Sequence, residues 1–183
     1  TLTGAGVAVG GLLALRALAP FLVAPLAGVF ADRYNRKWIL IWSDILRGLI
    51  MLGFLFVRNE RDVWLLFGLT ALQFAVSGFF FPTRNAILPD VVQPEEVGAA
   101  NALSSVTWSV MLAFGTAVGG IISGWLGVYT AFVLDALTFV VSAYFIWQIQ
   151  YVQTSTDSGS KGIGDAVSQY VDGLQYLLAK PDT

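Results

Sequence analysis

Four ionisable side chains stand inside long apolar runs of this chain: Arg16, Asp44, Arg47 and Asp135. If those runs cross a membrane, each charge is costly and needs a partner or a water-filled cavity. Asp44 and Arg47 are three residues apart and therefore share one helix face. We expect them to form an ion pair, with Arg84 within reach from the end of the next run. Such a network would tie helices together or would open and close a passage between them.

Arg16 is a fixed cation near the middle of the first apolar run. It suits an anionic or zwitterionic ligand or a carboxylate gate, and the alternative is burial against carbonyl oxygens or a carboxylate of another helix. Asp135 is a candidate proton carrier, with a hydrogen-bonded structural carboxyl as the alternative.

The residue types argue against an enzyme. The chain contains neither His nor Cys, which removes the commonest general base, the commonest metal ligand and all thiol chemistry. We therefore expect no catalytic residue, no metal and no cofactor. ATP hydrolysis is not supported, because no Gly-rich phosphate loop ending in Lys-Ser or Lys-Thr occurs. Nucleic-acid binding is not supported either, because no basic patch with interleaved aromatics is present.

Composition indicates that the charges are positioned by membrane helices. The 183 residues are 56% hydrophobic and 12% charged, whereas soluble domains carry about 25% charged residues. A helix needs roughly 20 residues to cross the hydrocarbon core. We predict an all-α transmembrane bundle over residues 1–151, with five spans at about 7–30, 38–57, 63–81, 103–126 and 129–149. Residues 152–183 read as a hydrophilic linker with a short amphipathic helix at about 163–180.

Prolines and glycines punctuate this pattern. The third span is predicted to end at Pro82, and a polar connection is predicted to lead to a new helix start at Pro94, a residue suited to the first helical position. The fourth span carries small residues four apart, which favours close helix packing. They are Gly115, Gly119, Gly120 and Gly124.

The distribution of Lys and Arg predicts the orientation. Most cations fall on one side of the alternating spans: Arg33, Arg36, Lys37, Arg84, Lys161 and Lys180. Only Arg58 and Arg61 fall on the other side. The first side is therefore predicted to be cytoplasmic, which places loop 32–37 and the C-terminus inside and the N-terminus outside. The simplest account of an external start is that an upstream span is missing and the chain is a fragment.

The loop Gly28-x-Phe30-Ala31-Asp32-Arg33-x-Asn35-Arg36-Lys37 resembles the signature loop of the major facilitator superfamily, Gly-x-Leu-Ala-Asp-Arg-x-Gly-Arg-Arg/Lys. Phe30 and Asn35 depart from that pattern. The stretches 81–90 and 99–103 resemble the connection between the fourth and fifth helices in one branch, which includes enterobactin-type siderophore exporters and macrolide efflux proteins. Residues 115–120 are similar to the fifth-helix motif of antiporters, with Thr116 where Pro is expected.

The resemblance implies a secondary active transporter that exports amphipathic small molecules such as drugs or siderophores, with the proton as coupling ion. It implies that the five spans are helices two to six, and that the first helix and the C-terminal half of the same protein are partners, together with the lipid bilayer and a small-molecule substrate. Gly28, Asp32, Arg33, Arg36 and Lys37 would form a cytoplasmic gating loop. Gln73 and Ser77 would face the cavity, and the location would be the plasma (inner) membrane. An uptake or lysophospholipid carrier, and a non-transporting sensor or assembly protein, remain the alternatives.

Overall fold

The computed structural model describes residues 2–151, all of whose regular elements are helical. The five long helices are α1 (Leu2–Arg33), α2 (Arg36–Gly53), α3 (Val63–Val91), α4 (Val97–Leu126) and α5 (Val128–Gln148). Single 3-10 turns occupy Phe54–Phe56, Glu60–Asp62 and Pro94–Glu96. The linker and amphipathic helix predicted for residues 152–183 lie outside the described residues, as do the side chains of Asp32 and Arg33.

The predicted all-α membrane fold is confirmed. Four helical segments are long and apolar enough to cross a bilayer: Arg36–Phe56, Glu60–Val91, Pro94–Leu126 and Val128–Gln148. Within α1, a shorter apolar stretch covers Gly10–Ala24. The chain is therefore an integral membrane protein.

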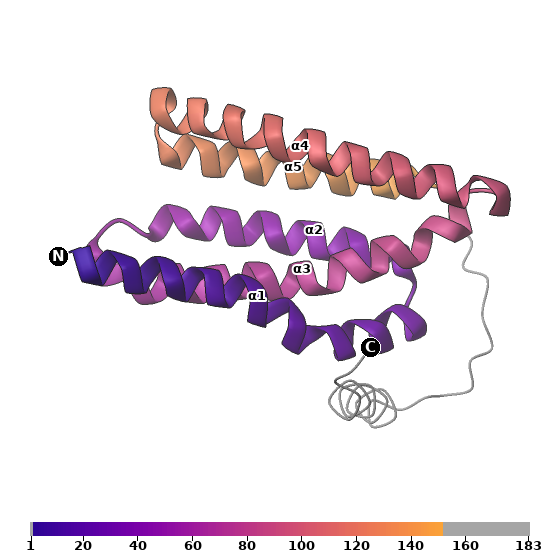
Figure 1. The fold of residues 1–183 in the computed structure, drawn as a ribbon, viewed down its shortest axis with the longest axis horizontal. Coiled ribbons are helices and arrows are strands. Elements are labelled where there is room, and N and C mark those ends of the chain that lie inside the picture. The colour runs from indigo at the N-terminus through magenta and orange to yellow at the C-terminus, as the bar shows by residue number, and fades with distance from the viewer. Residues whose placement is uncertain (1, 152–183) are drawn as a thin grey trace, which may run out of the picture.

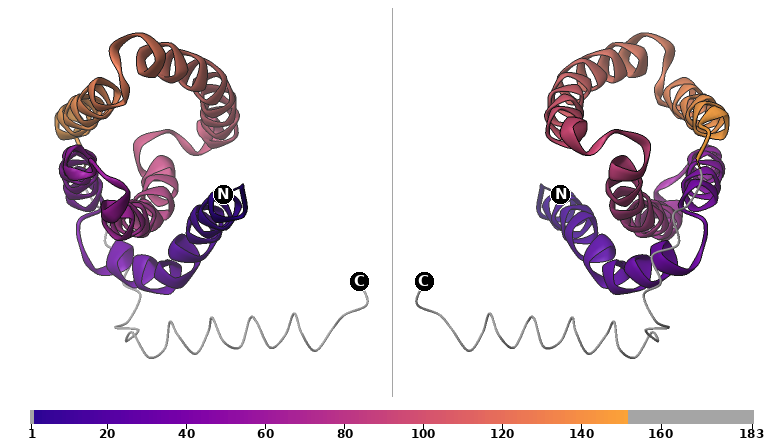
Figure 2. Two further views of the ribbon diagram at one scale, coloured as in Figure 1. Left: turned by 90° about the vertical axis from the view of Figure 1, so that its left-hand side faces the viewer. Right: turned by 90° about the vertical axis from the view of Figure 1, so that its right-hand side faces the viewer.

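The helices form an incomplete ring. Contacts follow the order α1, α3, α2, α5, α4, and Figure 2 shows these helices end-on as a horseshoe with α1 and α4 at its two tips. Their axes run roughly side by side in Figure 1, coloured there by position along the chain. This spatial order differs from the chain order, so the interior of the horseshoe is lined by residues far apart in sequence.

Small residues set the closest helix approaches. A Cβ added at Gly78 of α3 would lie 3.1 Å from Pro20 Cα of α1, and one added at Gly48 of α2 would lie 3.4 Å from the carbonyl oxygen of Ala136 in α5. In contrast, no described atom lies within 4 Å of a Cβ built at any of the four glycines of α4 predicted to pack. No described helix covers that face, and its role in packing stays a prediction.

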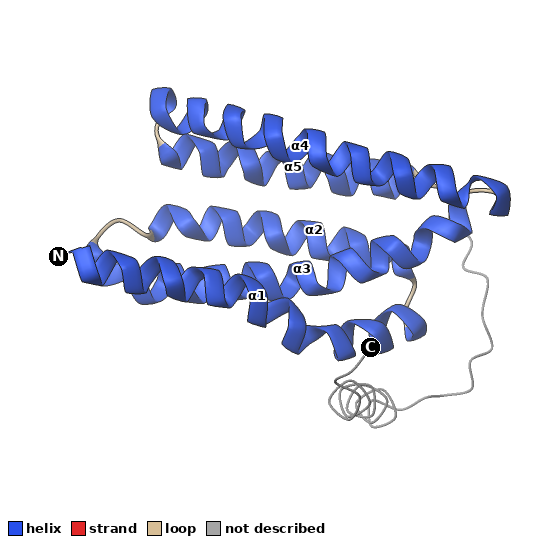
Figure 3. Ribbon diagram, viewed as in Figure 1, coloured by secondary structure: helices blue, strands red, loops and turns tan. Residues whose placement is uncertain are grey.

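The third helix does not end at Pro82, which corrects the sequence prediction. α3 continues through both Pro82 and Pro89 to Val91 (Figure 3). Each proline removes one backbone donor, which leaves a carbonyl four residues earlier without its helical partner. The fixed φ of proline is compatible with a helix, and Arg36 of α2 holds the continuation through hydrogen bonds to the Ala86 carbonyl and the Asp90 carboxylate. The side chain of Thr83, fully buried, donates from Oγ1 to the Phe79 carbonyl at 2.7 Å.

Helix starts obey ordinary capping chemistry. Asn35 caps α2 by accepting a hydrogen bond from the Lys37 N–H at 3.0 Å. Pro94 opens the turn before α4, and Gln93 and Glu96 form a reciprocal capping box around it. The predicted helix start at Pro94 is confirmed. Gly127, with φ of +87°, makes the tight turn into α5.

Candidate functional site

Arg36 joins three helices at one end of the bundle. Its Nη1 donates to the Asp90 carboxylate at 2.8 Å and to the Ala86 carbonyl at 3.0 Å, both on α3. Its Nε donates to the Ala31 carbonyl of α1 at 3.3 Å. One guanidinium thus fixes the ends of α1, α2 and α3 relative to one another, with the charge-assisted bond to Asp90 the strongest of the set.

The same end also holds the segment that leaves α5. The Lys37 ammonium donates to the Ile149 carbonyl at 2.7 Å, and the Tyr151 hydroxyl donates to the Asp90 carboxylate at 3.0 Å. Partial burial and the Asp90 carboxylate raise the pKa of the Tyr151 phenol above its usual range, so the neutral, donating form is favoured. We call Arg36, Lys37, Asp90 and Tyr151 the loop-end cluster.

The opposite end of the bundle holds a different set of contacts. The Asp62 carboxylate accepts the backbone N–H groups of Arg58 and Asn59 at 3.0 and 2.9 Å. The Tyr129 hydroxyl donates to the Val57 carbonyl at 2.8 Å. Here the charged side chains shape a turn, whereas those of the loop-end cluster link separate helices.

A buried ion pair lies within the bundle. Asp44 is 0% exposed, and its carboxylate accepts hydrogen bonds from the Arg47 guanidinium and from Ser142 Oγ, the latter at 2.6 Å. The predicted pairing of Asp44 with Arg47 on one helix face is therefore present. Ser142 belongs to α5, so the same carboxylate also ties α2 to α5.

The Arg47 guanidinium is sandwiched between two aromatic rings. Its central carbon lies 4.0 Å from the Phe80 ring centroid and 4.7 Å from that of Phe139. Such contacts stabilise a cation that has lost its water shell. Asp135 of α5 interacts with the same guanidinium electrostatically. Arg47 Nε is nevertheless buried without a hydrogen-bond partner among the described residues.

This ion pair borders a polar space inside the horseshoe. Two cavities of about 660 and 710 Å³ share Phe81, Arg84 and Trp108 in their walls, and we call them together the chamber. The chamber is bounded by α2, α3, α4 and α5. Its polar lining includes Asp44, Arg47, Arg84, Asn85, Asn101, Ser104, Ser105, Thr107, Ser109, Asp135, Thr138 and Ser142. Along α4 it extends from Asn101 to Met111, about 15 Å at 1.5 Å per residue.

The other predicted residues occupy separate places. Arg84 lines the chamber but makes no ion pair with Asp44 or with any other residue in the described part of the chain. Arg16 is exposed on α1 and lines none of the cavities described here. Ser77 donates to the Gln73 carbonyl within α3 at 2.9 Å, and neither side chain lines the chamber. A Cβ at Gly28 would meet no described atom.

Several residues of these sites were not predicted. Asp90, Tyr151 and Ser142 find their partners across 54 to 98 positions of sequence, as with Arg36–Asp90 and Asp44–Ser142, and no local spacing signals such pairs. The polar lining of α4 did carry a signal: Asn101, Ser105 and Ser109 recur four residues apart in an apolar helix, with Ser104 beside Ser105.

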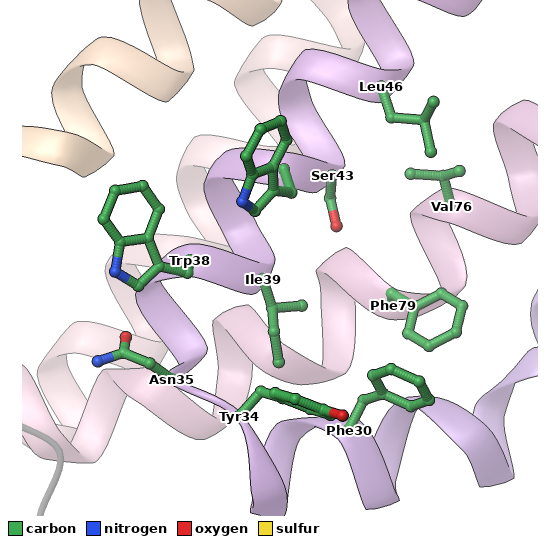
Figure 4. A pocket seen from close by; sticks show the side chains of 10 residues that line it. Phe30, Tyr34, Asn35, Trp38, Ile39, Ser43, Leu46, Val76 and Phe79 are labelled. Carbon is green, nitrogen blue, oxygen red and sulfur yellow. The ribbon is translucent and has the colours of Figure 1, made fainter.

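A third cavity, of about 590 Å³, is apolar and aromatic. Figure 4 shows Trp38, Ile39 and Leu46 of α2 around it, with Phe30 and Tyr34 below and Phe79 beside them. The Phe30 and Tyr34 rings stack at 5.3 Å between centroids. No charged side chain is among its lining residues, so it offers no chemistry comparable to that of the chamber.

Comparison with known proteins relates the chain to a family of membrane transporters. The family model described as Major Facilitator Superfamily matches residues 2–181. A Bacillus amyloliquefaciens protein whose name describes a bacilysin exporter is 29% identical over 91% of this chain and 41% of its own length. The multi-drug resistance efflux pump PmrA of Streptococcus pneumoniae is 31% identical over 67% of this chain and 30% of its own length. The chain thus spans about two fifths of the length of relatives such as the bacilysin exporter, and no solved structure matches it.

Proposed function

The chain belongs to the major facilitator superfamily, and on this premise we propose that the complete protein is a secondary active exporter of amphipathic small molecules. The observation that carries the proposal is the chamber, a charged and hydroxyl-rich space inside a bundle of apolar helices. Membrane helices retain such groups where they face partners or an aqueous pathway. The names of the relatives, an exporter and an efflux pump, favour export over uptake, over a lysophospholipid carrier and over a non-transporting protein.

The loop end of the bundle is proposed to face the cytoplasm of the cell, across its plasma membrane. Arg36, Lys37 and Arg84 gather toward this end, whereas Arg58 and Arg61 flank the opposite turn. Lys and Arg are enriched in short cytoplasmic loops. On this orientation, residues 152–183 enter the cytoplasm and are proposed to begin the linker between two halves of the transporter.

The loop-end cluster is the proposed gate. Its contacts join the ends of α1, α2, α3 and the exit of α5, so a movement of these ends relative to one another must break them. A ligand or proton that binds the two arrangements with different affinity shifts the population between them. Asp32, Arg33 and Gly28 are proposed to belong to this gate on the basis of the family signature alone.

The gate can be tested by removing one charge without changing its shape. Asp90→Asn in the complete protein keeps a hydrogen-bond acceptor but removes the ion pair with Arg36, and we expect slower efflux with unchanged membrane insertion. Asp62→Asn at the opposite turn is the matched control and is expected to leave efflux unchanged. Equal efflux in Asp90→Asn and the unmodified protein would contradict the gate. Asp32→Asn is expected to behave like Asp90→Asn.

Export and its coupling require a separate experiment. Cells producing the complete protein are loaded with carboxyfluorescein, an amphipathic organic anion supplied as its diacetate ester, and its accumulation is followed with and without a protonophore. We expect lower accumulation with the protein than without it, and loss of that difference when the proton gradient collapses. Asp135→Asn tests the proposed proton carrier and is expected to abolish gradient-driven efflux. Efflux that survives the protonophore would exclude proton coupling, and accumulation identical with and without the protein would contradict export of this dye.

A further inference from the structure

We propose that the chamber binds an amphipathic organic anion, with the ligand carboxylate at Arg84 and its apolar body against Phe81 and Trp108. This deepens the proposed function by naming the chemical class of ligand. The proposed cationic contact is Arg84, which borders both cavities of the chamber, in place of Arg16, which lines neither.

Among the described residues, Arg84 is the charged side chain of the chamber that has no partner. Asp44 is occupied by Arg47 and Ser142, and the electrostatic partner of Asp135 is also Arg47. Arg84 makes no hydrogen bond and no ion pair to a residue in the described range. Arginine stays protonated at any physiological pH and presents a planar fork of donors that matches a carboxylate. A ligand anion would supply the acceptor that the helices do not.

The polar residues around Arg84 suit the polar end of an amphipathic ligand. The amides of Asn85 and Asn101 line the same cavity, and neither makes a side-chain hydrogen bond to a described residue. Ser105 and Ser109 already donate to carbonyls of their own helix at 3.0 and 3.1 Å, so their oxygen lone pairs remain free to accept a ligand N–H. The site thus offers donors for a carboxylate and acceptors for a neighbouring amine or amide.

Arg47 contributes a buried donor to the wall of the chamber. Arg47, whose side chain is 9% exposed, lines the cavity of about 660 Å³, and its Nε has no hydrogen-bond partner among the described residues. Buried polar groups are almost always hydrogen-bonded in native proteins. This nitrogen is covered by its neighbours, with less than 1 Å² accessible, so an acceptor from a ligand or an accompanying water reaches it only when the lining of the cavity moves.

Two aromatic side chains, Phe81 and Trp108, form an apolar wall beside Arg84. Phe81 and Trp108 meet edge to face, with ring centroids 5.5 Å apart, and Trp108 remains 53% exposed. An aromatic surface next to a cation and amide donors can hold both parts of an amphipathic ligand. The cavity volumes of about 660 and 710 Å³ lie within the range of small-molecule sites.

The test uses two probes that differ by one charge. Dansylglycine carries a carboxylate and dansylglycinamide replaces it with a neutral amide. Their binding to the purified complete protein is measured by dansyl fluorescence anisotropy. A charge-assisted hydrogen bond distinguishes such ligands by about tenfold to a hundredfold in Kd, so we expect the unmodified protein to bind dansylglycine at least about tenfold more tightly.

Two variants then test whether Arg84 is the residue that causes the preference for dansylglycine. Arg84→Gln removes the cation, and Asn85→Asp places a competing carboxylate beside it. We expect both to bring the ratio of the two Kd values close to one while the affinity for dansylglycinamide changes less than about twofold. Arg58→Gln, at the opposite end of the bundle, is the matched control and is expected to keep the ratio. Because Asn85→Asp is nearly isosteric, it decides the matter even if Arg84→Gln does not fold.

Three results would overturn the inference: no preference for the anion in the unmodified protein, a preference that survives both variants, or a preference that is lost in Arg16→Gln instead. Absence of saturable binding of either probe would mean that another segment fills the chamber, and would overturn it as well. Proton-driven efflux of carboxyfluorescein without an anion preference in binding would refute only this inference. An anion preference without gradient-driven efflux would refute only the proposed function.

Discussion

Replacing one member of the buried Asp44–Arg47 pair should destabilise the protein far more than replacing both. Both side chains are almost completely buried, at 1% and 9% exposure. Removing one partner of a buried pair costs about 3–5 kcal/mol, because the other charge is left uncompensated, whereas replacing the pair with apolar groups of similar size is often neutral. We therefore expect Asp44→Leu to cost about 3–5 kcal/mol, and Asp44→Leu with Arg47→Leu to cost much less than the sum of the single variants.

The two single variants should also differ from each other. In Asp44→Leu the guanidinium of Arg47 cannot lose its proton, so it keeps its charge and must rely on Phe80, Phe139 and Asp135. In Arg47→Leu the Asp44 carboxyl can be neutralised by one proton and can keep its hydrogen bond with Ser142. The cost of Arg47→Leu should accordingly be the smaller of the two.

The assay is equilibrium unfolding of the complete protein in mixed micelles of dodecyl maltoside and sodium dodecyl sulfate, followed by tryptophan fluorescence. The double-mutant cycle yields the coupling free energy between the two side chains. A coupling of about 3 kcal/mol or more is expected. Single-variant costs that simply add in the double variant would refute the reasoning, since the charges would then be independent of each other.

The remaining predictions concern helix packing and the loop end. Gly78→Ala should cost about 1–3 kcal/mol, because its Cβ would press on the backbone of Pro20, whereas Gly68→Ala in the same helix meets no described atom and should be neutral or stabilising by up to about 1 kcal/mol; equal effects in the same unfolding assay would contradict the close approach. The neutral Tyr151 phenol should hold its bond to Asp90 fully below pH 10 and lose it as the pH rises through its raised pKa. A difference titration of tyrosinate absorbance between the unmodified protein and Tyr151→Phe should show a midpoint above 10, and a midpoint at or below 10 would contradict the burial of this hydroxyl.

Local signals in the sequence predicted the helical architecture and part of the site. Apolar run length predicted the membrane helices, and the three-residue spacing of Asp44 and Arg47 predicted their pairing, because both properties depend only on neighbours along the chain. The end of the third helix was predicted wrongly. The proline rule describes the loss of one hydrogen bond, but not the tertiary contacts that hold residues 83–91 in a helix.

The partners of the charged residues depended on the spatial order of the helices. Arg84 was expected within reach of Asp44, and both line one cavity. No ion pair joins them, and the carboxylate instead accepts from Ser142 of α5, 98 residues away. Arg36 was predicted in a gating loop without any indication that Asp90 would be its partner. Such pairs arise because α2 lies between α3 and α5 in the horseshoe, an arrangement that no spacing within a single helix encodes.

The uninterrupted course of α3 has a mechanical consequence. Its 29 residues measure about 43 Å at 1.5 Å per residue, whereas the hydrocarbon core of a bilayer is about 30 Å thick. The helix is therefore about 13 Å longer than the core is thick, and its last turns, the tip of the helix, carry Ala86 and Asp90. A tilt of about 10° around the far end would displace this tip by about 7 Å, more than twice the 2.8 Å that separates Arg36 from Asp90. A helix that ended at Pro82 would leave Asp90 in a separate segment, whereas here one continuous helix carries Asp90, so that a tilt of α3 also moves its contact with Arg36.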